Sequence, residues 1–212
     1  MADIFQEIDE DLRRDRWENV WKKYGKYVLG GAAVIVLGTA AWVGWQEYKL
    51  QQNLSVTYQM RAAMEAARAG NSEAAIEGFT AVSAAGDSQQ AALALLQEAA
   101  LRANNDDLES ARGIYQAVRD NGDLADPYRA LATIRLVEVD LDTGDAGTML
   151  GWLEPLAADA SEWRFVAWEL SAYLEKRQGN TAAAKSFLDR LLADDDTPVT
   201  ARARAEAYLA QL

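Results

Sequence analysis

Hydrophobic and polar positions divide the chain into two regions with different patterns. Residues 27–46 form a run of twenty without a charged side chain, YVLGGAAVIVLGTAAWVGWQ, which is apolar on every face of a helix. A helix of this length spans roughly 30 Å, the thickness of the hydrocarbon core of a bilayer. Aromatic residues gather at both ends, as they do at membrane interfaces: Trp17, Trp21, Tyr24 and Tyr27 at the start, and Trp42, Trp45 and Tyr48 at the close. The pattern predicts one transmembrane helix over residues 27–46, rather than a buried helix of a soluble core.

Charges around this run predict its orientation. Six basic residues precede it and only Lys49 follows closely; the six are Arg13, Arg14, Arg16, Lys22, Lys23 and Lys26. Because basic residues stay on the cytoplasmic side, we expect a cytoplasmic N-terminus and an exported C-terminal region. A cleaved signal peptide is the alternative, with a small-residue site at residues 39–41. The apolar run continues past that site to Trp45, which favours an uncleaved anchor.

Beyond the run, apolar residues recur at helical spacing. One such stripe contains Ala130, Ile134, Val137 and Leu141, and another contains Trp163, Ala167, Leu170 and Leu174. Only three prolines occur in the whole chain, and no stretch alternates as a half-buried strand would. The exported region is therefore predicted to be helical throughout.

Tight breaks between these helices recur about every 36 residues. Each break offers a polar residue that can accept hydrogen bonds from the first backbone N–H groups of the next helix: Asn71, Asp106, Asp145 and Asn180. Looser breaks fall between them, and a last helix follows Pro198. A helix pair cannot bury its apolar face alone, whereas stacked pairs can. We expect an all-α chain in which the transmembrane helix precedes a solenoid of about four helix pairs and a C-terminal capping helix.

The period and the turn resemble those of tetratricopeptide repeats. In that family the second helix of a repeat carries a small residue followed four positions later by a large apolar or aromatic one. Ala75 with Phe79, Ala111 with Tyr115, and Ala184 with Leu188 match this pattern and are predicted repeat-core residues. The third unit matches poorly, with Met149, Leu153 and Leu156, and Pro155 inside it predicts a kink or an early helix end. The first helices depart further, with charged residues at positions where the family has small or aromatic ones: Glu98, Arg102, Asp140 and Glu175.

Composition limits the chemistry of the exported region. From Leu50 onward, 14 Lys and Arg stand against 25 Asp and Glu, a net charge of −11, which disfavours nucleic acid as a partner. Cysteine and histidine are both absent from the chain, so disulfides, His- or Cys-ligated metals and Ser-His-Asp or Cys-His nucleophilic sites are excluded. Acidic residues around 138–145 do not match the ligand spacing of a calcium loop. We expect no catalytic residues, no metal and no cofactor, and therefore no enzyme.

Three segments follow from these observations: a cytoplasmic lead over residues 1–26, the signal anchor over 27–46, and a periplasmic repeat domain over 47–212. The whole chain resembles the YfgM-like ancillary subunits of the bacterial SecYEG translocon, through the opening DIFQEIDEDLRRDRWENVWKKYGKYVLGG, the anchor and the turn around Gly70-Asn71-Ser72. The resemblance implies a single-pass protein of the inner membrane. It implies partners too: the Sec translocon, a membrane-anchored periplasmic chaperone, and exported client proteins.

Two functional readings remain open. The first is an interaction scaffold that assists exported proteins. The second is a structural accessory subunit of another inner-membrane complex, held mainly by its transmembrane helix. Within that helix Gly31, Gly38, Trp42 and Trp45 share one face, where glycine permits a partner helix to approach closely, although glycine is also common in membrane helices generally. The lead can form an amphipathic helix, which would lie at the membrane surface or dock a cytoplasmic partner.

Overall fold

The computed structural model describes the backbone of residues 2–212 and the side chains of residues 22–27 and 29–212. This part of the chain contains nine α-helices and no strand, which confirms the predicted all-α class. The chain divides into two compact units, one ending at Ser55 and one spanning Val56–Leu212. Helix α1 (Ala2–Arg68) contributes to both, so its last part is the first helix of the second unit.

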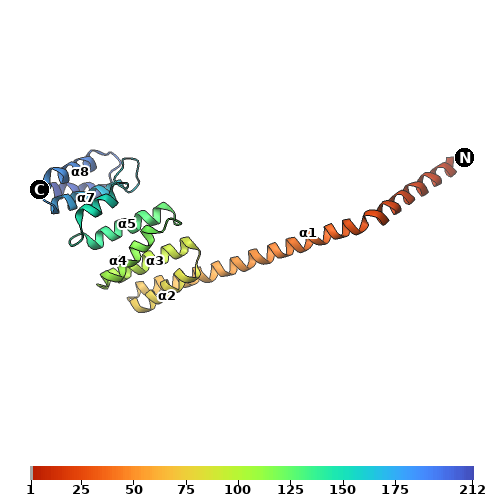
Figure 1. Ribbon diagram of the computed structural model, residues 1–212, viewed down its shortest axis with the longest axis horizontal. Coiled ribbons are helices and arrows are strands. Elements are labelled where there is room, and N and C mark those ends of the chain that lie inside the picture. Colours follow the sequence, from red (N-terminus) through yellow and green to blue (C-terminus); the bar gives the residue numbers. More distant parts are fainter. Residues whose placement is uncertain (1) are drawn as a thin grey trace. The chain divides into compact units, whose positions relative to one another are not determined.

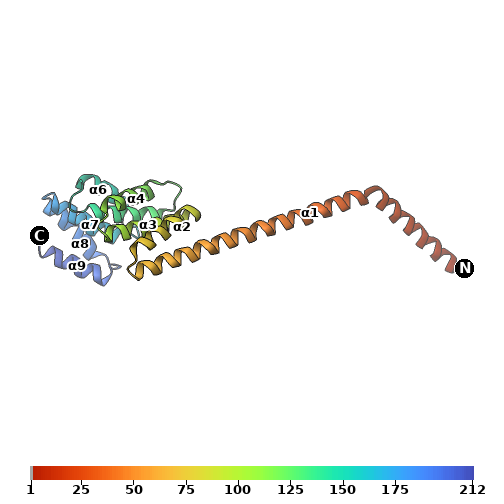
Figure 2. The same ribbon diagram turned by 90° about the horizontal axis from the view of Figure 1, so that it is seen from below.

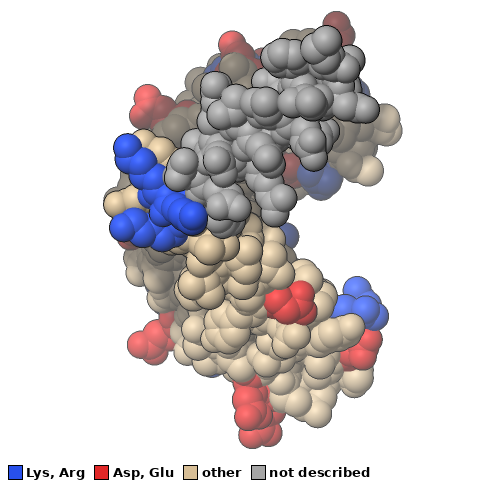
Figure 3. Space-filling view, turned by 90° about the vertical axis from the view of Figure 1, so that its right-hand side faces the viewer, with Lys and Arg blue, Asp and Glu red and all other residues tan. Residues whose placement is uncertain are grey.

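The first unit consists of α1 alone. Figures 1 and 2 draw α1 as one helix that bends towards its N-terminal end, and its apolar side chains are exposed along the described part of residues 22–55. It is the one helix, among the residues described, that is long and apolar enough to cross a membrane. Lys22, Lys23 and Lys26 are exposed just before the apolar run. Figure 3 shows a group of basic side chains beside a broad surface without charge. The amphipathic face predicted for the lead lies outside the described side chains.

The second unit stacks helices in chain order (Figure 1). Its elements after α1 are α2 (Ser72–Ala85), α3 (Ser88–Asn104), α4 (Leu108–Asp120), α5 (Asp126–Asp140), α6 (Ala146–Leu153), α7 (Arg164–Arg177), α8 (Thr181–Ala193) and α9 (Val199–Leu209). Residues 56–68 pair with α2, α3 pairs with α4, α5 with α6, and α7 with α8. Four helix pairs and a final helix agree with the predicted solenoid.

Three of the four tight turns have the same backbone geometry. Gly70, Asp106 and Gly179 each adopt positive φ angles, of 78°, 63° and 84°. The amide after each one donates to the carbonyl five residues earlier, as Asn71 N does to Ala66 O at 2.9 Å. These bonds define Schellman caps, which satisfy the last carbonyls of a helix while reversing the chain. The turn is therefore a repeated structure, and in the second of the four turns Asp106 takes the place of glycine.

Two of the four predicted N-caps are confirmed and two are wrong. The side chain of Asn71 accepts from Ala74 N at 3.3 Å, and that of Asp145 accepts from Thr148 N at 2.8 Å. Asp106 is instead the left-handed residue of its turn, and Asp107 caps α4 by accepting from Ser110 N at 3.3 Å. Asn180 occupies the N-cap position of α8, but its amide donates to Glu175 Oε2 at 2.8 Å and makes no cap bond.

Proline ends the third pair early, as expected. Helix α6 stops at Leu153, two residues before Pro155, because proline lacks the N–H that a continuing helix requires. A segment of ten residues of turns then leads to α7, which begins at Arg164. The third pair thus has a second helix of only eight residues.

Apolar side chains of this unit form four core clusters that overlap by helix. The first cluster joins α1, α2 and α3, and the second joins α3, α4 and α5. The third joins α5, α6 and α7, and the last joins α7, α8 and α9. Helices α3, α5 and α7 therefore pack into two clusters each, whereas the even-numbered helices pack into one. This sharing of the odd helices makes the four pairs a continuous stack.

Candidate interaction surface

Predicted repeat-core residues occupy equivalent places in the even-numbered helices. Ala75, Ala111 and Ala184 are fully buried, and Phe79, Tyr115 and Leu188 are no more than 2% exposed. In the poorly matching third unit Met149 and Leu153 are buried in the same way. These side chains hold the helix pairs together and leave the surface to other residues.

The four residues suggested as contacts within the apolar run lie on one face of α1. Trp42 and Trp45 are 66% and 60% exposed, and a Cβ built on Gly31 or Gly38 would meet nothing within 4 Å among the described residues. Tyr48 and Lys49 of the same helix lie against Trp45, with the Tyr48 ring centroid 6.3 Å and Lys49 Nζ 5.7 Å from the centroid of its ring. This face is available to lipid or to another helix.

Two hollows lie between the odd-numbered helices of the repeat unit. The larger, with a volume of about 580 Å³, lies between α5, α7 and α9, and we call it the α5–α9 groove. It is lined by Glu138, Leu141, Val166, Glu169, Leu170, Tyr173, Leu188, Arg204, Ala205, Tyr208 and Gln211. A smaller hollow of about 320 Å³ between α3 and α5 shares Glu138 with it.

Charged groups in the α5–α9 groove are paired with one another. Arg204 donates to both carboxylate oxygens of Glu169, from Nε at 2.6 Å and from Nη2 at 2.7 Å. At the shared wall, Arg135 Nη1 donates to Glu138 Oε2 at 2.7 Å. The rim is therefore locally neutral, although the region after Leu50 carries a net charge of −11. An apolar segment meets less unfavourable desolvation here than on the acidic surface elsewhere.

Two tyrosines form one wall of the groove. The rings of Tyr173 and Tyr208 stack with centroids 6.3 Å apart and planes inclined by 19°. Tyr173 donates its hydroxyl to Asp142 Oδ1 at 2.5 Å, and this bond to a carboxylate raises the pKa of the phenol. Burial raises the pKa of Tyr208, and Lys176 Nζ lies 4.8 Å from its ring centroid. Both rings stay neutral and fixed in place, as suits an aromatic contact surface.

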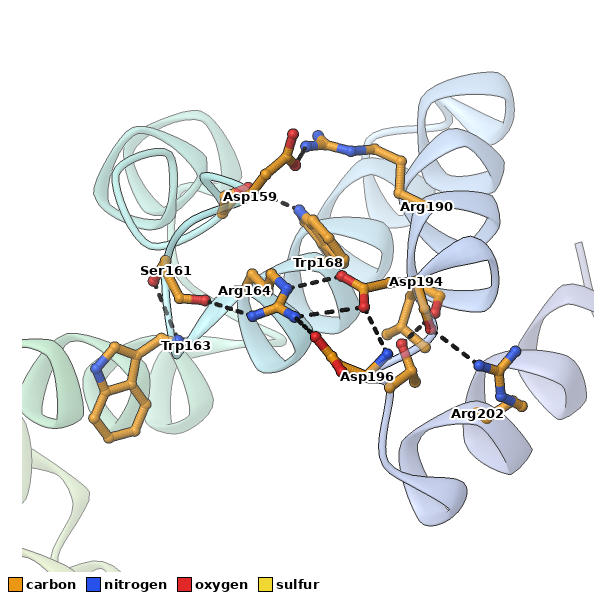
Figure 4. Close-up of polar contacts among 12 residues, drawn as sticks. Asp159, Ser161, Trp163, Arg164, Trp168, Arg190, Asp194, Asp196 and Arg202 are labelled. Carbon is orange, nitrogen blue, oxygen red and sulfur yellow. Dashed lines mark hydrogen bonds and ion pairs between the residues drawn. The ribbon is translucent and has the colours of Figure 1, made fainter.

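A polar cluster fixes the two helices that carry this wall (Figure 4). Arg164, at the start of α7, donates from Nε to Asp194 Oδ2 at 2.8 Å, and this bond holds the pKa of Asp194 below its usual value. Arg202 of α9 donates to the backbone carbonyl of Asp194 at 3.0 Å and to that of Leu192 at 2.5 Å. Trp168 Nε1 donates to Ala157 O at 2.8 Å, which ties the segment before α7 to the same core. The cluster joins α7, the turn after α8, and α9.

Two of the four charged residues that departed from the repeat pattern, Glu98 and Asp140, form bonds between neighbouring helices. Glu98, nearly buried, accepts from Thr80 Oγ1 at 3.0 Å and from Arg102 Nε at 2.8 Å. Arg112 of α4 donates to both oxygens of Asp140 at the end of α5, with Nε at 2.8 Å and 3.0 Å from them. These residues replace small or aromatic packing by hydrogen bonds, so their place in the fold is structural.

A third hollow, of about 510 Å³, is separate from the α5–α9 groove. It lies between α4, α5 and the segment after α6. Trp152, Trp163, Pro127 and Pro155 are among its lining residues. The guanidinium of Arg119 stacks 4.2 Å from the ring centroid of Trp152 and is paired with the carboxylate of Asp120. The hydrogen bond from Arg119 lowers the pKa of Asp120, and the carboxylate of Asp120 balances the charge of the guanidinium.

Sequence reasoning did not identify the groove, although a signal for it is present. Glu138, Tyr173 and Tyr208 are spaced 35 residues apart, so they occupy one register in successive odd helices. Glu169 and Arg204 share another register with the same spacing. Aligning the odd helices by this period would have placed these residues on one surface.

Comparison with known proteins gives one match. A family model described as a tetratricopeptide repeat-like domain matches residues 18–204. No curated protein and no solved structure matches the chain. Domains of this kind are typically non-catalytic modules for binding other proteins. The family model covers most of the chain, and the repeat length, the helix caps and the buried core positions agree with it. The chain therefore belongs to the tetratricopeptide repeat-like domain family.

Proposed function

We propose that this protein is a membrane-anchored interaction scaffold that holds an apolar segment of a partner or client protein in the α5–α9 groove. The observation that carries the proposal is the groove itself, with its aliphatic and tyrosine walls and its paired charges. A uniformly acidic surface would have favoured the alternative, an accessory subunit held in its complex mainly by the transmembrane helix. Leu141, Val166 and Leu170 instead supply apolar area for a bound side chain.

The apolar run of α1 serves as the anchor in this proposal. Its one polar side chain before Gln46, Thr39, donates to carbonyls of the same helix at Ile35 and Val36, both at 2.9 Å. A hydroxyl bonded in this way needs no partner from the lipid. The basic residues before the run support a cytoplasmic N-terminus, so the proposal includes a repeat unit in the periplasm and an anchor in the bacterial inner membrane.

Resemblance to the ancillary subunits of the translocon suggests the partners. Proteins leaving the Sec translocon expose apolar segments that have not yet been buried, and such segments suit the walls of the groove. We therefore propose that the scaffold associates with the translocon and with a membrane-anchored periplasmic chaperone, and that it assists exported proteins there. Tethering to the same membrane raises the effective concentration for such encounters towards the millimolar range.

A charged residue in the groove tests the binding site. Val166→Asp places a carboxylate on the apolar wall, whereas Val199→Asp places one at a position that is 83% exposed outside the groove. Val166→Asp should sharply lower the recovery of exported clients after crosslinking in membranes, and Val199→Asp should leave it unchanged. Circular dichroism checks that both variants stay folded. Equal recovery from the two folded variants would mean that the groove does not bind clients.

Protease accessibility tests the proposed topology. Protease added outside spheroplasts should digest the repeat unit and spare an N-terminal tag. A repeat unit protected in intact spheroplasts would reverse the orientation. The same protein with Lys22, Lys23 and Lys26 changed to Gln provides a comparison in which the orientation signal is weakened.

The alternative function, an accessory subunit held mainly by its transmembrane helix, is favoured by the exposure of Trp42 and Trp45 on α1. Replacing the apolar run with an unrelated span and deleting the residues after Leu50 separate the two functions. The scaffold requires both parts, so partner recovery should fall in both variants. Full recovery with the span alone would establish the accessory role.

A further inference from the structure

A second surface lies on α1, where apolar residues follow a regular stripe. Steps of three and four residues connect its eight members, seven of them apolar and one, Glu47, acidic. We call them the α1 stripe: Leu29, Ala33, Val36, Ala40, Val43, Glu47, Leu50 and Leu54. All eight side chains are exposed. At 100° per residue the stripe faces away from Gly38, Trp42 and Trp45, so it is distinct from the face with the glycines.

This stripe continues beyond the apolar run. Leu50 and Leu54 lie four and eight residues past Gln46, about 6 Å and 12 Å further along the helix. They are nevertheless 53% and 47% exposed. A shallow hollow of about 420 Å³ lies beside the stripe here, lined by Val43, Glu47 and Leu50 and by the polar residues Gln46, Lys49 and Asn53. Two large aliphatic side chains outside the bilayer, in line with those inside it, indicate a contact surface that crosses the boundary.

We propose that the α1 stripe docks a membrane-spanning helix of a different protein, one that continues as a helix beyond the bilayer. This inference rests on the proposed placement of residues 27–46 in the membrane. The average step is about 3.6 residues, the period of an α-helix, so the eight positions stay on one line along its surface, against which a second helix can lie. Lipid would cover only the part up to Gln46, and a soluble ligand only Leu50 and Leu54. A long helix covers both.

Charge selects the occupant. Glu47 lies in the middle of the stripe and accepts a hydrogen bond from Gln51 Nε2 at 3.1 Å. In a symmetric parallel pair of this chain, Glu47 of each copy would face the other at the contact, and two repeat units of charge −11 would be brought together. A second copy is therefore disfavoured. The partner helix carries Lys or Arg at the level of Glu47, and this pair sets the register of the two helices.

Photocrosslinking in native membranes tests the stripe with the full chain. A crosslinking amino acid is placed singly at Val43, Leu50 and Leu54, and as matched controls at Tyr48 and Gln52, which are exposed on the other side of the same turns. Adducts at the stripe should exceed those at the controls by about tenfold or more, since contact is lost half a turn away. Mass spectrometry of the adduct should identify one protein and a peptide that adjoins its span and contains Lys or Arg. Even labelling of all positions, adducts with lipid alone, or an adduct of two copies of this chain would overturn the proposal.

Charge variants give a second readout. Glu47→Lys should abolish the adduct formed at Val43, whereas Glu47→Gln should retain part of it, because an amide can still hydrogen bond across the contact. Unchanged adducts in Glu47→Lys would contradict the pairing. The outcome is separable from that of the scaffold proposal. If the stripe gives no adduct while Val166→Asp still lowers client recovery, the stripe is wrong and the scaffold stands.

Discussion

The closest helix contact in the first repeat offers a sharp test of the packing. Gly78 of α2 lies against Ala63 of α1, and a Cβ built on Gly78 would come within 2.7 Å of Ala63 Cβ and 3.3 Å of Ala63 Cα. Ordinary contacts between carbon atoms are about 3.5–4.0 Å. Because one of the two obstructing atoms belongs to the backbone, a change of rotamer cannot relieve the overlap. Gly78→Ala therefore forces the two helices apart.

Two opposing effects decide the sign of the change. Alanine favours a helix interior over glycine by about 1 kcal/mol. Separating the helices loosens the cluster that contains Val56, Phe79 and Val82, and overpacking of this kind costs about 1–3 kcal/mol. We take the upper part of that range because the overlap exceeds about 0.8 Å and involves backbone. Gly78→Ala should then lower the free energy of unfolding by about 1–2 kcal/mol.

Gly113→Ala is the matched control, since Gly113 lies within α4 and a Cβ there would meet nothing within 4 Å among the described residues. It should stabilise the protein by up to about 1 kcal/mol through helix propensity alone. Hydrogen exchange of the full chain in mild detergent measures both, with loss of protection confined to α2 and residues 56–68 in Gly78→Ala. Equal stabilisation by the two variants would show that α1 and α2 do not pack as described.

Three further predictions concern the core, a turn and acid stability. Phe79→Ala should cost about 3 kcal/mol in chemical denaturation, from lost burial and the cavity that remains, and a change near zero would contradict its buried position. Asp106→Gly should stabilise by about 0.5–1 kcal/mol in the same assay, because glycine adopts the φ of 63° without steric cost, and a loss would show that the carboxylate contributes more than the strain. Arg164 lowers the pKa of Asp194, so this carboxylate stabilises the fold above the unfolded-chain value of about 3.9 and loses that effect as the pH falls below it. The melting temperature should therefore fall as the pH is lowered through this range, and less steeply in Asp194→Asn; identical pH profiles would remove Asp194 from the acid response.

Sequence patterns predicted the even-numbered helices better than the odd ones. Helices α2, α4 and α8 bury a single face, so Ala75 and Phe79, or Ala184 and Leu188, stand out at a spacing of four. Helices α3, α5 and α7 bury two faces, so one stripe, such as that of Ala130, Ile134 and Val137, describes only part of their buried residues. Glu98 and Asp140 obscured the pattern further, because the partners that make them acceptable, Thr80 and Arg112, are distant in sequence.

Turn residues were predicted to within one position, and the error has a physical cause. An Asn-Asp-Asp sequence offers several residues that tolerate both the left-handed conformation and the cap position. Asp106 adopted the first role and Asp107 the second. The groove could not be predicted from one helix at a time, because Tyr173 and Tyr208 meet only when successive repeats are stacked.

The shortness of α6 has a consequence for the cooperativity of unfolding. In a stack of repeats, each unit is stabilised by its neighbours, and an unfolding front stops where the coupling between neighbours is weakest. With eight residues, α6 offers little interface to α5 and α7, and the turns that follow it supply few helical hydrogen bonds. We therefore expect helices α7 to α9, joined by Arg164 and Arg202, to unfold separately from α2 to α5. Since α5 lies on one side of that division and α7 and α9 on the other, a bound segment that spans the groove should couple the two blocks into one unfolding transition.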